Sequence, residues 1–147
     1  MTRFFVACCC LIAAFAARAE VIDIDAAELA KLTAAGIPLI DIRTAAEWEQ
    51  TGIVPGSRLL QFFDERGKSS PAAWLDRARA IAKPGDPVIL ICRSGNRTRA
   101  VSAFLSQDAA YTKVYNVKNG LLAWIKEGRP VISATPSLAA CRKTNLC

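Results

Sequence analysis

The chain has 147 residues, which suits one domain and is too short for two of ordinary size. Its net charge is +6, but the basic residues do not form a stripe interleaved with aromatic residues, which argues against nucleic-acid binding. Histidine is absent, so a histidine general base, a cysteine–histidine dyad and a histidine-ligated metal are excluded.

The first 19 residues have the pattern of a secretory signal peptide. Arg3 supplies the positive start, residues 4–17 form an apolar run, and Ala17-Arg18-Ala19 is a small-x-small cleavage site. The run is short for a bilayer span, and a retained membrane anchor is the alternative. We therefore expect a mature chain from Glu20, with a net charge of +4, in the periplasm or outside the cell and free of the membrane.

Short apolar strands alternate along the mature chain with segments of helical periodicity. Strands are predicted at residues 21–24, 38–42, 58–62, 87–91 and 113–117. Helices are predicted at about 26–35, from 44 onward, 71–81, 97–109 and 121–127. This alternation indicates an α/β domain over residues 20–132 with parallel strands, and residues 133–147 are expected to be a loosely held tail.

Three of the predicted helices have capping signals at their amino ends. Asp25 is suited to the N-cap of the first helix, and Ser70 precedes Pro71 at the start of the third. Thr44 and Glu47 have the spacing of a capping box at the start of the second helix, which gives Glu47 a structural role.

Cleavage of the leader leaves three cysteines, Cys92, Cys141 and Cys147, in a compartment where disulfides persist. Cys141 and Cys147 lie close together in the polar tail, so we expect them to pair and to leave Cys92 as the free thiol. The alternative is that a tail cysteine acts as a resolving partner for Cys92. Three cysteines without histidine or a C-x-x-C pair do not match a zinc site, and no metal is expected.

Cys92 stands where the fourth predicted strand ends and a helix follows. The run before it is short and β-branched, as in a buried parallel strand, and the polar segment after it is Cys92-Arg93-Ser94-Gly95-Asn96-Arg97-Thr98. Exposed N–H groups and the positive end of the helix dipole converge at such a junction. That environment holds an anion and favours thiolate over thiol, so we interpret Cys92 as a nucleophile.

Four segments of the chain resemble, in the same order, the motifs of rhodanese-like domains. They are Asp41-x-Arg43-x-x-x-Glu47-Trp48, Gly52-Ile53-Val54-Pro55-Gly56-Ser57, Cys92-Arg93-Ser94-Gly95-Asn96-Arg97, and Asn116-Val117-Lys118-Asn119-Gly120 with its sequel to Val131. The resemblance covers residues 21–131, and single-domain exported bacterial members, including the phage-shock type, are the most similar. The usual paired glycine is Asn119-Gly120 here, and asparagine tolerates a left-handed backbone.

The resemblance implies a five-stranded, mainly parallel sheet flanked by helices, and no cofactor. It also implies sulfur transfer from thiosulfate or a persulfide donor to cyanide or a thiol through a persulfide on Cys92. The partners implied are a small anionic sulfur donor and a thiophilic acceptor, with a protein thiol as a possible acceptor.

The positions of the residues around Cys92 suggest roles for them. Ser94, Gly95, Asn96, Arg97 and Thr98 are expected to aim backbone N–H groups at the persulfide, and Arg93 and Arg97 to add positive charge. Asp41 and Arg43, at the end of the neighbouring strand, are expected to form a structural ion pair rather than to take part in the chemistry. One of Phe62 and Phe63 is expected at the pocket rim.

Two other functions remain as alternatives. Related phosphatases and arsenate reductases need one more loop residue and an arginine six places after the cysteine, where this chain has Thr98. A persulfide carrier or binding module for a protein partner would hold sulfur on Cys92 with negligible turnover of thiosulfate and cyanide.

Overall fold

The computed structural model describes residues 19–144 and residue 147. The predicted signal peptide lies outside the described residues except for Ala19. The strands are β1 (Glu20–Ile24), β2 (Leu39–Asp41), β3 (Arg58–Leu59), β4 (Val88–Ile91) and β5 (Lys113–Val117). The helices are α1 (Ala26–Ala34), α2 (Ala45–Thr51), α3 (Pro71–Arg79), α4 (Asn96–Gln107), α5 (Gly120–Lys126) and α6 (Thr135–Thr144). Within the described ranges, none of these helices has the length and hydrophobicity that crossing a membrane requires.

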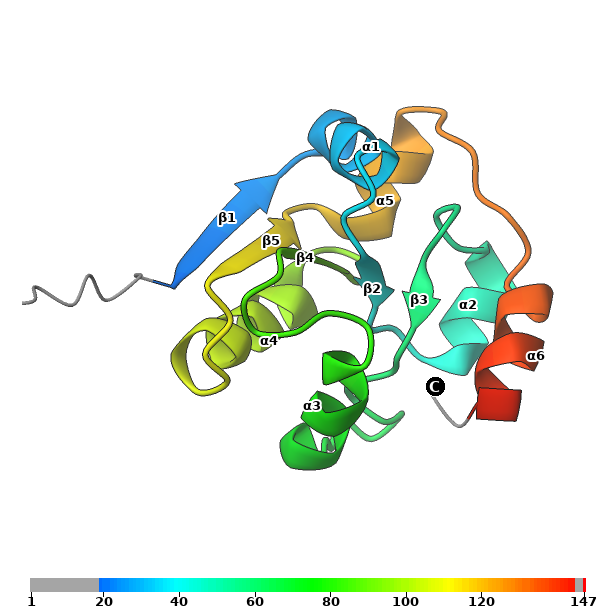
Figure 1. Ribbon diagram of the computed structural model, residues 1–147. Helices are drawn as coiled ribbons and strands as arrows, with labels where there is room; N and C mark the ends of the chain where they lie inside the picture. Colours follow the sequence, from blue (N-terminus) through cyan, green and yellow to red (C-terminus); the bar gives the residue numbers. More distant parts are fainter. Residues whose placement is uncertain (1–18, 145–146) are drawn as a thin grey trace, which may run out of the picture.

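The five strands form one sheet in the order β1-β5-β4-β2-β3, and every pairing between neighbouring strands is parallel. The predicted five-stranded parallel α/β fold is therefore confirmed (Figure 1). β4 is central and all four of its residues are buried, because both faces of the sheet are covered by helices. The register aligns Asp41 with Ile91, so the residues that follow β2 and β4 meet at the same edge of the sheet.

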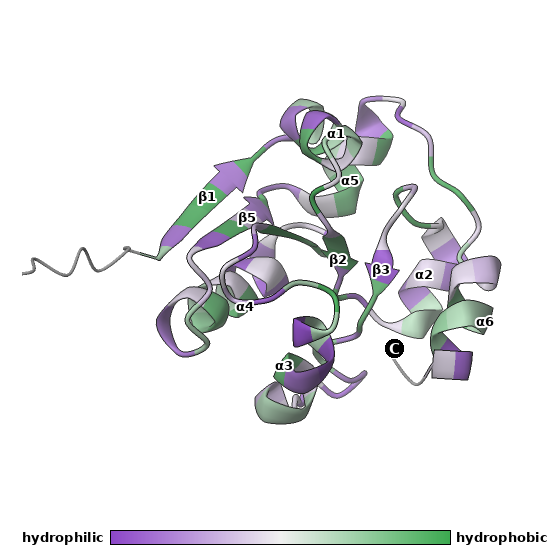
Figure 2. Ribbon diagram, in the orientation of Figure 1, coloured by the Kyte–Doolittle hydropathy of each residue, from purple (hydrophilic) through white to green (hydrophobic). Residues whose placement is uncertain are grey.

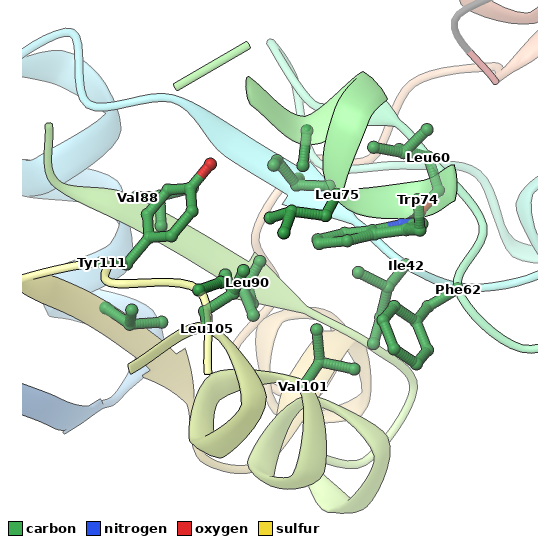
Figure 3. Packing of buried hydrophobic residues seen from close by; sticks show 14 of the residues in the cluster. Ile42, Leu60, Phe62, Trp74, Leu75, Val88, Leu90, Val101, Leu105 and Tyr111 are labelled. Carbon is green, nitrogen blue, oxygen red and sulfur yellow. Dashed lines mark hydrogen bonds between the residues drawn. The ribbon is translucent and has the colours of Figure 1, made fainter. Parts of the chain in front are cut away.

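Alternate residues of the strands enter two separate hydrophobic clusters. Ile40 and Leu90 join Trp74 and Val101 on the face covered by α3 and α4, and Figure 3 shows several of these side chains converging with Phe62. On the other face the cluster contains residues from the strands, α1 and α5: Leu29, Leu39, Ile89, Ile91, Leu121 and Trp124. In Figure 2, where each residue is coloured by its hydropathy, many of the hydrophobic residues accordingly lie in the sheet.

The expectation of a loosely held tail is wrong. Residues 135–144 form α6, which lies beside α2 at the β3 edge of the sheet (Figure 1). Leu138 is buried in a third cluster with Trp48, Ile53 and Leu59. The sequence gives little sign of this helix, because its contact with the domain depends on one large apolar side chain among alanines and polar residues.

Four local features also differ from the sequence predictions. β3 has only two residues, and α3 ends at Arg79 rather than near Ile81. Ser70 makes no side-chain capping bond, so Pro71 alone supplies the starting signal of α3. The left-handed residue after β5 is Gly120, with φ of +58°, whereas Asn119 has φ of −111°.

Candidate active site

Cys92 directly follows β4, and α4 begins four residues later at Asn96. The backbone of the junction is held from two sides. Ile42 N–H donates to the carbonyl of Ile91 at 3.0 Å, and Leu121 N–H donates to the carbonyl of Cys92 at 2.8 Å. The second contact needs glycine at position 120, since a Cβ there would overlap the carbonyls of Cys92 and Arg93. The start of α5 therefore fixes the position of the cysteine.

Two polar groups lie against the sulfur of Cys92. Gly95 N–H donates to Sγ at 3.1 Å, and Thr98 Oγ1 lies 3.6 Å from Sγ. Thr98 is fully buried and its hydroxyl also donates to the carbonyl of Gly95 at 3.0 Å, which secures the loop. Gly95 N–H and the amino end of α4 stabilise negative charge on sulfur, while the Thr98 hydroxyl, whose proton goes to the carbonyl of Gly95, holds the loop in place.

The Cys92 side chain has no solvent-exposed surface (0%) and belongs to the hydrophobic cluster that contains Ile42, Phe62 and Val101. Among the described residues it is the one free cysteine. Its sulfur thus faces a polar loop within an otherwise apolar surrounding, where electrostatic contacts are stronger than in water. A substrate reaches Sγ only after side chains or the loop move, and the neighbouring Arg93 and Ser94 are exposed.

The sequence predicts that residues 94–98 aim backbone N–H groups at the sulfur. Among the described residues, the N–H of Gly95 is the one that contacts Sγ. Gly95 has φ of +89°, and a Cβ at this position would overlap the carbonyl of Lys118 in the loop after β5. Both the turn and the close approach of the two loops therefore depend on glycine. Asn96 is exposed and begins α4.

The guanidinium group of Arg97 is held in an ion pair and is not directed freely toward a substrate. Its Nη1 and Nη2 donate to the two carboxylate oxygens of Glu47, at 2.8 and 2.6 Å. The hydrogen bonds with Glu47 and the attraction of Cys92 raise the pKa of Arg97, against the effect of burial. Glu47 has the predicted capping role, since its carboxylate also accepts from Thr44 N–H at 3.0 Å. Glu47 thus joins the start of α2 to the first turn of α4, next to residues 92–95, which we call the cysteine loop; sequence reasoning missed this second role.

Ionisation of the Glu47 carboxyl group is expected to make the free energy of unfolding depend on pH in the acid range. Burial raises its pKa, but hydrogen bonds from Arg97 and Thr44 outweigh burial and lower the pKa from 4.5 to about 2. Its contribution to stability is therefore present above pH 4.5 and is lost as pH falls toward 2. Glutamine keeps the capping ability but not the charge, so Glu47→Gln should lower the free energy of unfolding at neutral pH.

Urea unfolding at stepped pH measures this effect. The difference between the wild type and Glu47→Gln should shrink as pH falls from about 4.5 to 2. Glu49→Gln is the matched control, because Glu49 is exposed on the same helix. A difference between wild type and Glu47→Gln that stays constant over this pH range would contradict the assignment.

Asp41 and Arg43 form a buried ion pair. Arg43 Nη2 donates to Asp41 Oδ2 at 2.6 Å, and Arg43 Nε donates to both carboxylate oxygens at 2.9 and 3.0 Å. The remaining donors of Arg43 reach Thr51 Oγ1 at 2.7 Å and the carbonyl of Gly52 at 2.9 Å. These contacts tie the end of β2 to the end of α2 and engage the donors of Arg43 within the protein.

A cavity of about 560 Å³ opens beside Arg93 and Arg97; its wall also includes Glu47, Phe63, Asp64 and Glu65. We call it the mouth cavity. Phe63 and the two acidic residues belong to the loop after β3, which ends at the same edge of the sheet as β4. Sequence reasoning named Phe62 and Phe63 as rim candidates but missed Asp64 and Glu65. The described residues contain no group of three or more potential metal ligands.

In the tail, Cys141 and Cys147 are joined by a disulfide, with their Cα atoms 5.3 Å apart. Cys141 lies near the end of α6. Cys147 is further held because Arg77 Nη1 donates to its carbonyl at 2.7 Å. The pairing leaves Cys92 outside any bridge, and the tail cysteines contact the third cluster instead of the cysteine loop.

Comparison with known proteins identifies relatives of this domain. The family model described as rhodanese-like domain matches residues 25–127. A protein named sulfurtransferase from Allochromatium vinosum is 34% identical over 96 residues, which cover 65% of this chain and 78% of that protein. Thiosulfate sulfurtransferase 18 of Arabidopsis thaliana is 27% identical over 116 residues, which cover 76% of this chain and 84% of that protein.

A solved structure gives the same result for the fold. The crystal structure of a rhodanese-related protein from Thermoplasma volcanium superimposes with a TM-score of 0.57 at 28% sequence identity. The alignment covers 76% of this chain and 97% of that one. The matched family segment contains Asp41, Cys92 and the whole loop between β4 and α4, but it ends before α6.

Proposed function

Since this chain belongs to the rhodanese-like domain family and is a rhodanese-type sulfurtransferase, we propose that it moves a sulfane sulfur from thiosulfate, or from a persulfide donor, to cyanide or a thiol. The observation that carries the proposal is the free sulfur of Cys92, placed between Gly95 N–H, Thr98 Oγ1 and the start of α4. A thiolate is the form that this arrangement stabilises and the form that attacks sulfur.

The reaction proceeds in two transfers. The Cys92 thiolate attacks the outer sulfur of thiosulfate, the S–S bond of thiosulfate breaks, and sulfite leaves with the bonding electron pair. An acceptor thiolate or cyanide then attacks the terminal sulfur of the Cys92 persulfide, and the Cys92 thiolate is the leaving group. Covalent catalysis of this kind gives ping-pong kinetics.

The surroundings of Cys92 serve each transfer differently. Gly95 N–H replaces part of the hydration that a sulfur anion loses on burial, so the thiolate is stabilised without water. Arg93, which lines the mouth cavity and is exposed, supplies positive charge where an anionic donor enters. Burial of Sγ keeps water and oxidants from the persulfide between the two transfers.

The proposal includes export of the mature chain from residue 20 onward. The Cys141–Cys147 disulfide supports it, because structural disulfides persist in oxidising compartments and are rare in the cytosol. The basic mature chain suits a small anionic donor, and neither nucleic acid nor a membrane is a proposed partner.

Steady-state kinetics with thiosulfate and cyanide test the proposed activity. Thiocyanate and sulfite should form in equal amounts, and double-reciprocal plots at several cyanide concentrations should be parallel. A persulfide donor in place of thiosulfate identifies which donor has the higher kcat/KM. A persulfide on Cys92 without turnover of either donor would support the carrier alternative and contradict the enzymatic proposal.

A further inference from the structure

A second cavity, of about 670 Å³, lies apart from the cysteine loop and is bounded by α2, α3, the loop after β3 and α6. We call it the α6 cavity. Leu138, Arg142 and Cys147 form one of its walls. These three residues follow the segment 25–127 that the family model matches. This wall is therefore an addition of this chain to the family domain, fastened by the Cys141–Cys147 disulfide.

The walls of the α6 cavity are positively charged. Lys68, Arg77 and Arg142 reach it from three separate segments, against a single acidic side chain, Asp64. Among the described residues, none of these four takes part in an ion pair. The hydroxyl-bearing Ser69 and Ser70 also line it. Arg77 is held by the carbonyl of Cys147, which leaves Lys68 and Arg142 as the cations of this cavity without a partner among the described residues. Such cations beside hydroxyl groups in a cavity of this size fit a small organic anion.

Trp48 provides an independent observation on the same wall. Its side chain is 1% exposed, it lines the α6 cavity, and its Nε1 has no hydrogen-bond partner in the described part of the chain. Buried indole N–H groups normally have an acceptor, because leaving one unpaired costs free energy. By contrast, Nε1 of Trp74, which also lines the α6 cavity, donates to the carbonyl of Leu60 at 3.0 Å.

The α6 cavity adjoins the mouth cavity beside the cysteine loop. Asp64 lines both cavities, Phe62 lines the first and Phe63 lines the second. The rings of the two phenylalanines touch edge to face, with centroids 4.8 Å apart. Phe62 also belongs to the hydrophobic cluster that contains Cys92. The α6 cavity thus meets the mouth cavity at Asp64 and at one pair of aromatic rings.

We propose that the α6 cavity binds the carboxylates of the sulfur acceptor, and that this acceptor is a small carboxylate-bearing thiol. The inference rests on the proposed function. Lys68 and Arg142 hold the carboxylates while the thiol extends past Phe62 and Phe63. The acceptor thiolate attacks the terminal sulfur of the Cys92 persulfide, the S–S bond to Cys92 breaks, and the Cys92 thiolate leaves. The acceptor departs as a persulfide.

Kinetics of the second transfer test this inference. The probes are glutathione, which carries two carboxylates, and 2-mercaptoethanol, which carries none. In the double variant Lys68→Ala with Arg142→Ala, KM for glutathione should rise about tenfold while kcat stays unchanged. The reason is that the two lost charge contacts stabilise the bound thiol and the transition state equally. The parameters for 2-mercaptoethanol should stay at their wild-type values. Arg79→Ala with Lys83→Ala, two exposed cations outside both cavities, is the matched control.

A binding measurement separates this inference from the proposed function. S-methylglutathione keeps both carboxylates but cannot accept sulfur, and its binding can be followed by the fluorescence of Trp48 and Trp74 or by calorimetry. Saturable binding that weakens about tenfold in the double variant supports the anion site. Equal KM changes for both thiols, or no saturable binding, would overturn it. Binding without formation of a Cys92 persulfide from any donor would instead overturn the proposed function and the acceptor role with it.

Discussion

Replacing Cys92 by serine is expected to reduce sulfur transfer from thiosulfate to cyanide by a factor of about 10⁴ or more. A serine hydroxyl is not ionised at neutral pH, and an oxygen at this position cannot form the persulfide through which the sulfur must pass. Gly95 N–H and Thr98 Oγ1 would still surround the side chain, so the loss reflects the missing nucleophile and not a missing binding site. Steady-state assays of thiocyanate formation measure it.

The fold should survive this change. Serine is close to cysteine in size, and the polar groups at Gly95 and Thr98 can hydrogen-bond its hydroxyl. Burial of a hydroxyl in place of a thiol costs some stability, which thermal unfolding would record as a modest decrease in Tm. A serine variant that folds and retains more than a small fraction of wild-type turnover would contradict the role of Cys92.

Gly95→Ala is expected to lower turnover by about a hundredfold or more, comparable to the loss of one preorganised donor in other active sites. Alanine at a φ of +89° is strained by roughly 1–2 kcal/mol, and its Cβ would overlap the carbonyl of Lys118. The loop must shift to relieve the overlap, which moves the Gly95 N–H away from Sγ. Kinetics and urea unfolding should both change, because the same residue shapes the loop and supplies the donor.

Gly85→Ala is the matched control for this substitution. Gly85 lies before β4, its φ is outside the left-handed region, and no atom lies within 4 Å of a Cβ built there. The control should therefore have wild-type turnover and close to wild-type stability. If Gly95→Ala behaved like Gly85→Ala, the Gly95 N–H would have no part in stabilising the sulfur anion.

The features that could be predicted from sequence are those that neighbouring residues determine. A β-branched run followed by a short polar segment placed Cys92 at the junction of β4 and α4, and the Thr44–Glu47 spacing gave the capping box that starts α2. Strand and helix alternation predicted the parallel sheet, because parallel strands require crossover connections. These inferences need no knowledge of which distant segments meet.

The features that the sequence did not reveal depend on distant contacts. Glu47 and Arg97 are 50 residues apart in sequence, so their pairing appears only once α2 and the cysteine loop have been brought together. α6 has a single large apolar contact, Leu138, and its periodicity is too weak to predict a packed helix. Burial of Cys92 likewise follows from the positions of Phe62 and Val101 on other elements.

The most direct test of the account is the mass of the intact protein after incubation with thiosulfate and removal of excess donor. The wild-type protein should gain the mass of one sulfur atom, fragmentation should place it on Cys92, and added cyanide should remove it. The Cys92→Ser variant treated identically should gain nothing. A wild-type protein that gains no sulfur from thiosulfate or, in a parallel sample, from a persulfide donor, or an equal gain in the serine variant, would contradict the claim that Cys92 carries sulfur between donor and acceptor.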